Sequence, residues 1–170
     1  MYQLRIANLS DLDILCQLES CHARQESRGH WQSEALPRQL LSLLLEKHLV
    51  VFATEESKTI AYGIAADWQT MVSMPLYKKG FDLVKQQQKA APWCHWGPVW
   101  VSPSERGHGL CGQLFAFALT HLEQQYRSIQ AIVAEDNEAS FQAHSREGMM
   151  TVASYFSSQG QDYYLLNRDI

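Results

Sequence analysis

Two glycines and an arginine stand where an apolar stretch gives way to a helical pattern, and this arrangement suits an anion. Residues 99–112 read VWVSPSERGHGLCG. Glycines at the start of a helix let the backbone approach a ligand closely, and the first N–H groups of a helix have no partner within it. These donors and the positive end of the helix dipole favour phosphate, and Arg106 adds forked donors suited to phosphate oxygens. The sequence therefore predicts a phosphate-bearing ligand at Gly107 and Gly109.

Patterned segments on both sides of this loop predict the elements that hold it. Apolar alternation and runs predict strands at 3–7, 49–54, 59–67, 93–101, 128–134, 151–157 and 162–167. Apolar residues at helical spacing predict helices that begin at Ser10, Ser33, Leu110 and Ala139, the last ending at Glu147. Ser10 is the expected N-cap of the first helix. The mixed order of these elements predicts one α and β domain over residues 1–170.

Composition narrows the classes of partner. The 170 residues carry 14 Lys and Arg against 18 Asp and Glu, a net charge of −4. This balance argues against nucleic acid as a binding partner. An acidic surface suits a cationic or amine ligand better than an acidic one. The chain has no leader pattern and no apolar stretch of about 18 residues, so we expect a cytoplasmic protein without a membrane segment.

The cysteines and histidines show no spacing typical of metal ligands. The cysteines, which we expect to be reduced thiols without a metal, are Cys16, Cys21, Cys94 and Cys111.

One stretch is long for a connection in a compact fold. About two dozen residues separate the strand that ends near Asp67 from the strand that begins near Trp93. We expect an irregular insertion near 69–90, within which 75–90 has a helical pattern. A lid, a dimer contact and a surface excursion packed on the sheet edge all fit this segment.

The loop after Val101 resembles the acetyl-CoA signature of the GCN5-related N-acetyltransferase (GNAT) superfamily. That signature is Gln/Arg-x-x-Gly-x-Gly/Ala, and residues 106–111 occupy its six positions. Cys111 stands where Gly or Ala is usual, and Gly112 follows it. A second block, 137–144 followed by Gly148-Met149, is similar to the family's downstream Asn-x-x-Ala/Ser block, with His144 at the position that is usually Tyr.

The resemblance covers nearly the whole chain and implies a fold. We expect a single α/β (α+β) domain with a mixed, mostly antiparallel sheet of six to seven strands. About four helices would flank the sheet. The resemblance further implies that the strand at 93–101 splays from the strand at 128–134 and leaves a slot for a thioester.

The same resemblance implies acetyl-CoA as the cosubstrate. The main chain of the strand would pair with the pantetheine arm, and the N–H groups of the loop would hold the pyrophosphate. The implied strand residues are Val99, Trp100 and Val101, and those of the loop are Gly107, His108, Gly109, Leu110, Cys111 and Gly112. Arg106 would position the turn, Asn137 would hydrogen-bond the arm from the other side, and Ser140 would lie near the cofactor.

Acetyl transfer to an amine moves two protons, and two histidines are candidates for this work. His95 is on the strand of Val99 and Val101, which simple alternation places on one face, and relatives often carry a Glu or His base near that point. An imidazole titrates near neutral pH, which suits a base. His144 stands where relatives keep a Tyr that protonates the leaving sulfur. The alternative for each histidine is a structural side chain.

Two other functions fit parts of the pattern. Gly107-x-Gly109-x-x-Gly112, with Asp136 located 24 residues later, matches a dinucleotide-binding fingerprint, but only 58 residues follow Gly112. A domain that binds acyl-CoA without catalysis, as a sensor, is the second alternative. The favoured function is N-acetyl transfer to a small-molecule or peptide amine. The segment 24–31 stands where relatives line the acceptor pocket, but a solvated loop is the commoner outcome for such a composition. The acceptor stays open, and a homodimer is compatible with the resemblance.

Overall fold

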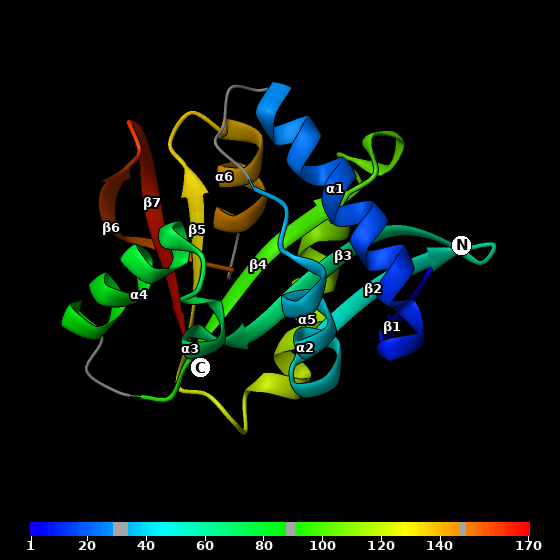
Figure 1. Ribbon diagram of the computed structural model, residues 1–170, viewed down its shortest axis with the longest axis horizontal. Coiled ribbons are helices and arrows are strands. Elements are labelled where there is room, and N and C mark those ends of the chain that lie inside the picture. The colour runs from blue at the N-terminus through cyan, green and yellow to red at the C-terminus, as the bar shows by residue number, and fades with distance from the viewer. Residues whose placement is uncertain (29–33, 88–90, 147–148) are drawn as a thin grey trace.

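The computed structural model describes residues 1–28, 34–87, 91–146 and 149–170. Seven strands form one sheet in the order β1-β2-β3-β4-β5-β7-β6 (Figure 1). The strands are β1 (Gln3–Ile6), β2 (Leu49–Glu55), β3 (Lys58–Asp67), β4 (Trp93–Val101), β5 (Ser128–Ala134), β6 (Thr151–Ser158) and β7 (Gln161–Asp169). The seven predicted strands are thus confirmed, with small shifts at their ends.

Helices cover both faces of the sheet (Figure 1). The six α-helices of the described residues are α1 (Leu12–Arg28), α2 (Arg38–Lys47), α3 (Trp68–Met71), α4 (Pro75–Gln87), α5 (Leu110–Leu122) and α6 (Glu138–Ser145). Helices α1 to α4 lie on one face, and α5 and α6 lie on the other. Two more helices are present than the resemblance implied, because α3 and α4 form in the segment expected to be irregular. The predicted starting point at Ser33 lies outside the described residues, and α2 follows Pro37 as N-cap.

The two central strands separate, as expected. β4 and β5 are parallel neighbours and pair only where residues 93–95 face residues 128–130. Beyond this point β4 pairs with β3 alone, and β5 pairs with β7. All other neighbouring strands are antiparallel, which excludes the dinucleotide-binding alternative because that fold needs a parallel sheet.

A β-bulge interrupts β4 at the fork. Gly63 of β3 faces Val99, and Ala65 faces Trp96, so the single residue Ile64 faces both Gly97 and Pro98. The extra residue shifts the alternation of side chains along the strand.

The bulge overturns the prediction that His95 shares a face with Val99 and Val101. Val101 packs with the cluster under α5, together with Ala61, its partner on β3. His95 faces Ala66, which belongs to the cluster under α1 and α2 on the opposite face. His95 and the two valines therefore face opposite sides of the sheet, and the prediction was wrong.

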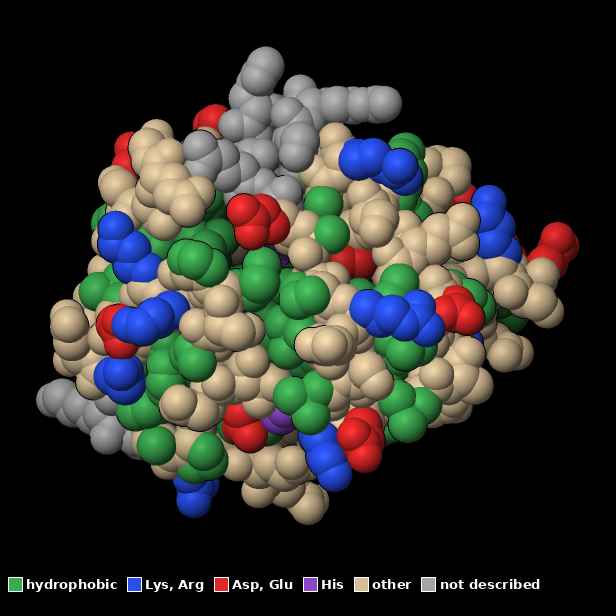
Figure 2. All heavy atoms as spheres, in the orientation of Figure 1, with side chains coloured by type: hydrophobic (Ala, Val, Ile, Leu, Met, Phe, Trp, Pro, Cys, Tyr) green, Lys and Arg blue, Asp and Glu red, His purple; other side chains and the backbone are tan. Residues whose placement is uncertain are grey.

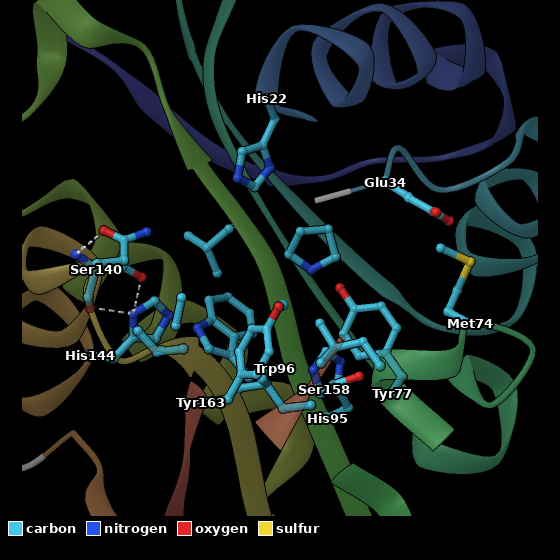
Figure 3. A pocket seen from close by; sticks show the side chains of 18 of the residues that line it. His22, Glu34, Met74, Tyr77, His95, Trp96, Ser140, His144, Ser158 and Tyr163 are labelled. Carbon is cyan, nitrogen blue, oxygen red and sulfur yellow. Dashed lines mark hydrogen bonds between the residues drawn. The ribbon is translucent and has the colours of Figure 1, made fainter. Parts of the chain in front are cut away.

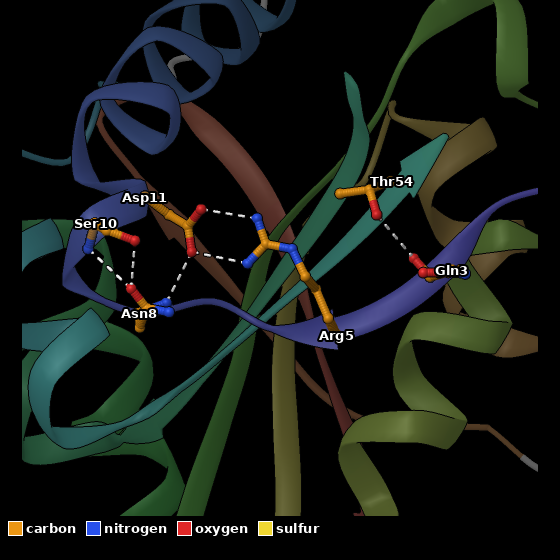
Figure 4. Close-up of polar contacts among 6 residues, drawn as sticks. All are labelled: Gln3, Arg5, Asn8, Ser10, Asp11 and Thr54. Atoms are coloured by element: carbon orange, nitrogen blue, oxygen red, sulfur yellow. Dashed lines mark hydrogen bonds and ion pairs between the residues drawn. The ribbon is translucent and has the colours of Figure 1, made fainter. Parts of the chain in front are cut away.

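The first helix is capped by Asn8, which corrects the expectation for Ser10. The Oδ1 atom of Asn8 accepts a hydrogen bond from the Ser10 backbone N–H at 2.9 Å. The backbone N–H of Asn8 donates in return to Asp11 at 2.9 Å, which completes a capping box around the 3₁₀ turn Leu9–Asp11 (Figure 4). The guanidinium of Arg5 donates two hydrogen bonds, of 2.7 and 2.8 Å, to the carboxylate of Asp11.

Helices α3 and α4 cover the sheet face next to α2. Trp68 and Phe81 stack with their ring centroids 5.9 Å apart and pack with Leu165 of β7 and Ile132 of β5. The described part of the 69–90 segment is therefore mostly helical and lies over a face of the sheet, not beyond its edge. Residues 88–90 lie outside the described part.

Candidate functional site

A cavity of about 620 Å³ lies at the fork between β4 and β5 (Figure 3). Five of the predicted site residues line it, namely His95, Val99, Asn137, Ser140 and His144. The wall on the other side comes from His22 of α1, from Glu34, and from residues 74–77. The fork thus brings His95 and Val99 of β4 into one space with three residues of the second motif block.

His95 forms a buried part of this cavity wall. Its ring lies edge-on to Trp68 and Tyr77, with centroid distances of 4.6 and 4.8 Å. Burial lowers the pKa of His95 to about 3, against the opposing effect of a hydrogen bond with the Gly97 backbone. The ring is neutral at pH 7, and its Nδ1 atom has no hydrogen-bond partner among the described residues.

A polar network inside the sheet fixes the indole beside His95. Gln130 of β5 is fully buried, and its Oε1 accepts a hydrogen bond from Trp68 Nε1 at 2.9 Å. Its amide nitrogen donates to Ser128 at 2.7 Å and to Asn167 at 2.8 Å. These hydrogen bonds hold the indole of Trp68 in one orientation. The ring of His95 therefore packs against a rigid neighbour.

His144 faces the cavity from α6, on the opposite side of the fork. Its Nδ1 lies 2.8 Å from the carbonyl oxygen of Ser140 and 3.4 Å from the Ser140 hydroxyl (Figure 3). Burial lowers the pKa of His144, and the hydrogen bond to Ser140 opposes this effect. The ring is held by the turn of its own helix.

Asn137 has a structural task at the start of α6. Its side-chain oxygen caps the helix by accepting from Ser140 N at 3.2 Å. The oxygen is thereby engaged, so the amide N–H groups are the part of this side chain suited to a ligand acceptor. Asn137 and Ser140 both line the cavity, as the expectation for the cofactor arm requires.

The glycine loop lies after β4, outside the lining of the cavity. Gly107 and Gly109 have φ angles of 83° and 76°, and a Cβ at either position would meet no atom within 4 Å. Gly109 is the N-cap of α5, and the first backbone bond of the helix joins Gln113 N to Gly109 O at 3.2 Å. The N–H groups of Leu110, Cys111 and Gly112 precede that bond, which is the geometry of a helix N-terminal anion site.

Other loop residues have distinct surroundings. Arg106 Nε donates to the Val101 carbonyl oxygen at 3.0 Å, so this side chain ties the turn to the end of β4. Burial raises the pKa of the Cys111 thiol to about 11, so the thiol stays protonated near neutral pH. Cys111 therefore serves as a small apolar side chain in the loop. His108 is exposed.

The side chain of Trp100 is separate from the cavity. It is buried under α1 and α2 and stacks on Tyr62, with ring centroids 6.1 Å apart. The backbone N–H of Ser102 donates to the Ile60 carbonyl oxygen. Trp100 lies opposite Tyr62 in the same antiparallel register, so the main chain of Trp100 also points to β3. Val99 and Val101 are the residues whose main chain is directed away from β3.

A buried chain of polar groups beside the cavity was missed by sequence reasoning. Tyr62 donates a short hydrogen bond to the carboxylate of Glu19, and His22 Nδ1 lies 3.1 Å from the Tyr62 oxygen. Glu19 also accepts from the Leu36 backbone N–H at 3.2 Å. Since the Tyr62 hydrogen goes to Glu19, the Nδ1 atom of His22 is the donor in the second bond.

A sequence signal for this chain of groups did exist. Glu19 occupies the helical stripe of Leu15 and Ala23, and all three are buried. A carboxylate on an apolar stripe needs a partner on another element. The pattern does not name that partner, Tyr62, which comes from β3.

The cavity wall on the α1–α4 face combines apolar and aromatic side chains with one carboxylate. Glu34 is the acidic residue among the described lining residues, and these include no Lys or Arg. The expected lining segment 24–31 ends outside the described residues, as do Glu147 and Gly148 of the second block. On the face drawn in Figure 2, basic and acidic side chains both occur, and neither kind covers a large continuous area.

The described residues contain no group of three or more His, Cys, Asp or Glu side chains able to hold a metal ion. Among the same residues, no helix combines the length and apolar character needed to span a bilayer.

Known structures share this fold. The N-acetyltransferase of Staphylococcus aureus Mu50 is 15% identical, with a TM-score of 0.71 over 99% of this chain and 98% of its own. NAA60 of Arabidopsis thaliana, crystallised with acetyl-CoA, is 14% identical, with a TM-score of 0.70 over 100% of both chains. The ribosomal-protein-alanine N-acetyltransferase of Brucella melitensis is 16% identical, with a TM-score of 0.70 over 99% of both.

At these identities the likeness establishes the fold alone, and the family comes from the sequence. No curated protein matches the chain. A model of the acetyltransferase (GNAT) family matches residues 15–149, which include the glycine loop and both histidines. The chain therefore belongs to the GNAT acetyltransferase family.

Proposed function

We propose that the protein is an acetyl-CoA-dependent N-acetyltransferase that passes the acetyl group directly to a primary amine. The observation that carries this proposal is the fork of β4 and β5, which opens a cavity with His95 on one side and His144 on the other. A direct transfer needs the amine and the thioester bound next to each other, and this cavity can hold both.

The residues of the fork and the loop suit acetyl-CoA. The free edge of β4 offers main-chain groups of Val99 and Val101 to the pantetheine arm, in the way an added strand pairs with a sheet edge. Leu110, Cys111 and Gly112 offer amides to the pyrophosphate. Asn137 and Ser140 close the arm's channel from the α6 side. The bound cosubstrate supplies an activated acyl thioester.

His95 is the proposed base. The amine must attack as a neutral nucleophile, and its nitrogen becomes cationic and acidic as it bonds to the acyl carbon. The unprotonated ring of His95 accepts the proton then lost, although burial lowers its pKa to about 3, below the near-neutral value on which the sequence argument relied. Its place on the α1–α4 face of the sheet is the acceptor side, where His22 and Glu34 also stand.

His144 is the proposed acid for the leaving sulfur. Its Nδ1–H is held by the Ser140 carbonyl, so a proton for the sulfur must be carried on Nε2. The position of His144 on α6, across the fork from His95, separates the proton donor from the proton acceptor. This separation lets one histidine lose a proton while the other gains one.

The lining favours an amine that carries no carboxylate nearby. Glu34 suits a cationic group, and the described lining offers no Lys or Arg to a carboxylate. Met74, Leu76 and Tyr77 suit an apolar body of the acceptor.

Calorimetry of acetyl-CoA binding, run in parallel with thiol release across a panel of amines, tests the proposal. We expect binding and amine-dependent release. Gly109→Ala introduces a side chain at a left-handed residue of the loop, and we expect about tenfold weaker binding. Gly160→Ala is the matched control, because Gly160 also has a positive φ, 80°, and open space, but lies in the β6–β7 turn.

Two results would contradict this function. Failure of the wild-type chain to bind acetyl-CoA removes it outright. Binding without thiol release for any amine favours the sensor alternative.

A further inference from the structure

Two buried nitrogen atoms without a hydrogen-bond partner line the cavity. Among the described residues, four buried side-chain nitrogens are unpartnered, on Trp93, His95, Trp96 and Arg168. Only His95 and Trp96 of these four line the cavity. An indole nitrogen is a donor and never an acceptor, so Trp96 presents an N–H at this wall. A buried donor without a partner destabilises a structure, and a bound acceptor atom relieves that cost.

The indole of Trp96 is held in one place by its neighbours. It is 1% exposed and lies edge-on to Phe115 of α5, with ring centroids 5.4 Å apart. On the other side it lies against the Gly63 backbone so closely that a Cβ at Gly63 would be 2.5 Å from Trp96 Cη2. A donor held this firmly is pre-organised and needs no rearrangement to meet an acceptor.

The direction of this donor is toward the α6 side of the fork. Trp96 directly precedes the Gly97–Pro98 bulge, at the point where β4 leaves β5. In Figure 3 its indole nitrogen points to the side of the cavity where Ser140 and His144 lie. Under the proposed function, on which this inference rests, that side holds the thioester.

We propose that the indole N–H of Trp96 donates a hydrogen bond to the acyl-thioester group of bound acetyl-CoA. This donor is a side chain, additional to the main-chain groups of the β4 edge. It meets the thioester from the α5 face, whereas His95 meets the amine from the opposite face. Trp96 thereby fixes the thioester relative to the attacking nitrogen.

The indole N–H resonances of the full chain test this directly. The chain has five tryptophans, which give five indole signals in a spectrum of protein labelled with ¹⁵N. Acetyl-CoA is added to saturation. We expect the Trp96 signal to move downfield more than the other four and its exchange with solvent to slow. Trp96→Phe identifies the signal by its loss. If that variant does not fold, Phe substitutions at the other four tryptophans identify it by elimination.

Binding affinity gives a second readout with a matched control. Trp96→Phe keeps an aromatic ring and removes the donor, and we expect about fivefold weaker acetyl-CoA binding. Among the described residues, Trp93 has the other unpartnered indole nitrogen, and it lies outside the cavity lining. Trp93→Phe makes the same chemical change there, and we expect unchanged affinity.

The possible failures are distinguishable. If the wild-type chain does not bind acetyl-CoA, the proposed function fails. If acetyl-CoA binds and the Trp96 signal moves no more than the Trp93 signal, the inference about Trp96 is wrong and the proposed function stands. Equal affinities of Trp96→Phe and the wild type would also overturn the inference.

Discussion

The Nδ1 atom of His144 lies 2.8 Å from the carbonyl oxygen of Ser140, one helical turn earlier. A carbonyl oxygen can only accept, so the imidazole must carry its hydrogen on Nδ1, and in the neutral ring Nε2 keeps a lone pair. A side chain of α6 is thereby held in one tautomer by the backbone of its own helix.

Replacing His144 tests its proposed role as the acid. We expect His144→Phe to lower kcat about 10- to 100-fold and to change its pH dependence, with acetyl-CoA affinity within about twofold of wild type. kcat is measured across about pH 5 to 9. His48→Phe is the control, because burial also lowers the pKa of His48, which hydrogen-bonds Thr70 outside the cavity lining. An unaltered pH profile in His144→Phe would remove the assignment.

Replacing His95 tests its role as the base. Because the general base assists the proton transfer alone, we expect His95→Gln to lower kcat about a hundredfold and to leave acetyl-CoA affinity unchanged. Steady-state kinetics and calorimetry measure the two quantities. His121→Gln, at the exposed end of α5, serves as the control. Wild-type turnover in His95→Gln would exclude His95 as the base.

Burial of His95 also predicts how stability depends on pH. The pKa is about 3 in the folded chain and about 6.5 in the unfolded chain, so between these values the unfolded chain binds one proton more. The free energy of unfolding should therefore fall as the pH falls through this window, by about 1.4 kcal/mol per pH unit from this group. Urea titrations at several pH values measure the slope. His95→Gln should flatten it, and a slope equal to wild type would contradict the prediction.

Tyr62 satisfies a buried carboxylate, and removing its hydroxyl should be costly. In Tyr62→Phe one oxygen of Glu19 loses its donor inside the protein. We expect the free energy of unfolding to fall by about 1–3 kcal/mol. Denaturant titration gives the value. Tyr155→Phe makes the same change on a side chain that is 67% exposed and should change stability by less than about 0.5 kcal/mol. Equal effects of the two substitutions would show that Glu19 gains nothing from Tyr62.

Gly63 makes room for the indole of Trp96. A methyl group there overlaps the ring, so we expect Gly63→Ala to cost about 1–3 kcal/mol of unfolding free energy and to weaken acetyl-CoA binding. Gly112→Ala is the stability control, because its Cβ would sit at an ordinary 3.7 Å from Met149 Sδ. Alanine is also favoured over glycine within a helix. Thermal melting compares the two variants, and a Gly63→Ala chain as stable as wild type would contradict the close packing.

Local patterns in the sequence were sufficient for most elements of the fold. The strands at 93–101 and 128–134 have the predicted bounds, because strand alternation and turn residues act over a few neighbours. The helix cap moved from Ser10 to Asn8, since the competing side chains differ by only two positions and the choice depends on the contact between Asp11 and Arg5. The segment 75–87 is helical as its pattern indicated, but its place over β5 and β7 was not readable from it.

The sequence by itself determined the family and the glycine loop at the start of α5, because both depend on residue types at fixed short spacing. It also offered the two histidines as candidates. Only the tertiary structure decided on which face each histidine lies. A bulge at Gly97 and Pro98 reverses the alternation of β4, and a bulge is defined by the pairing with β3, which lies more than 30 residues earlier in the chain. The Glu19–Tyr62 bond and the partnerless indole of Trp96 likewise depend on contacts between distant elements, which no local pattern specifies.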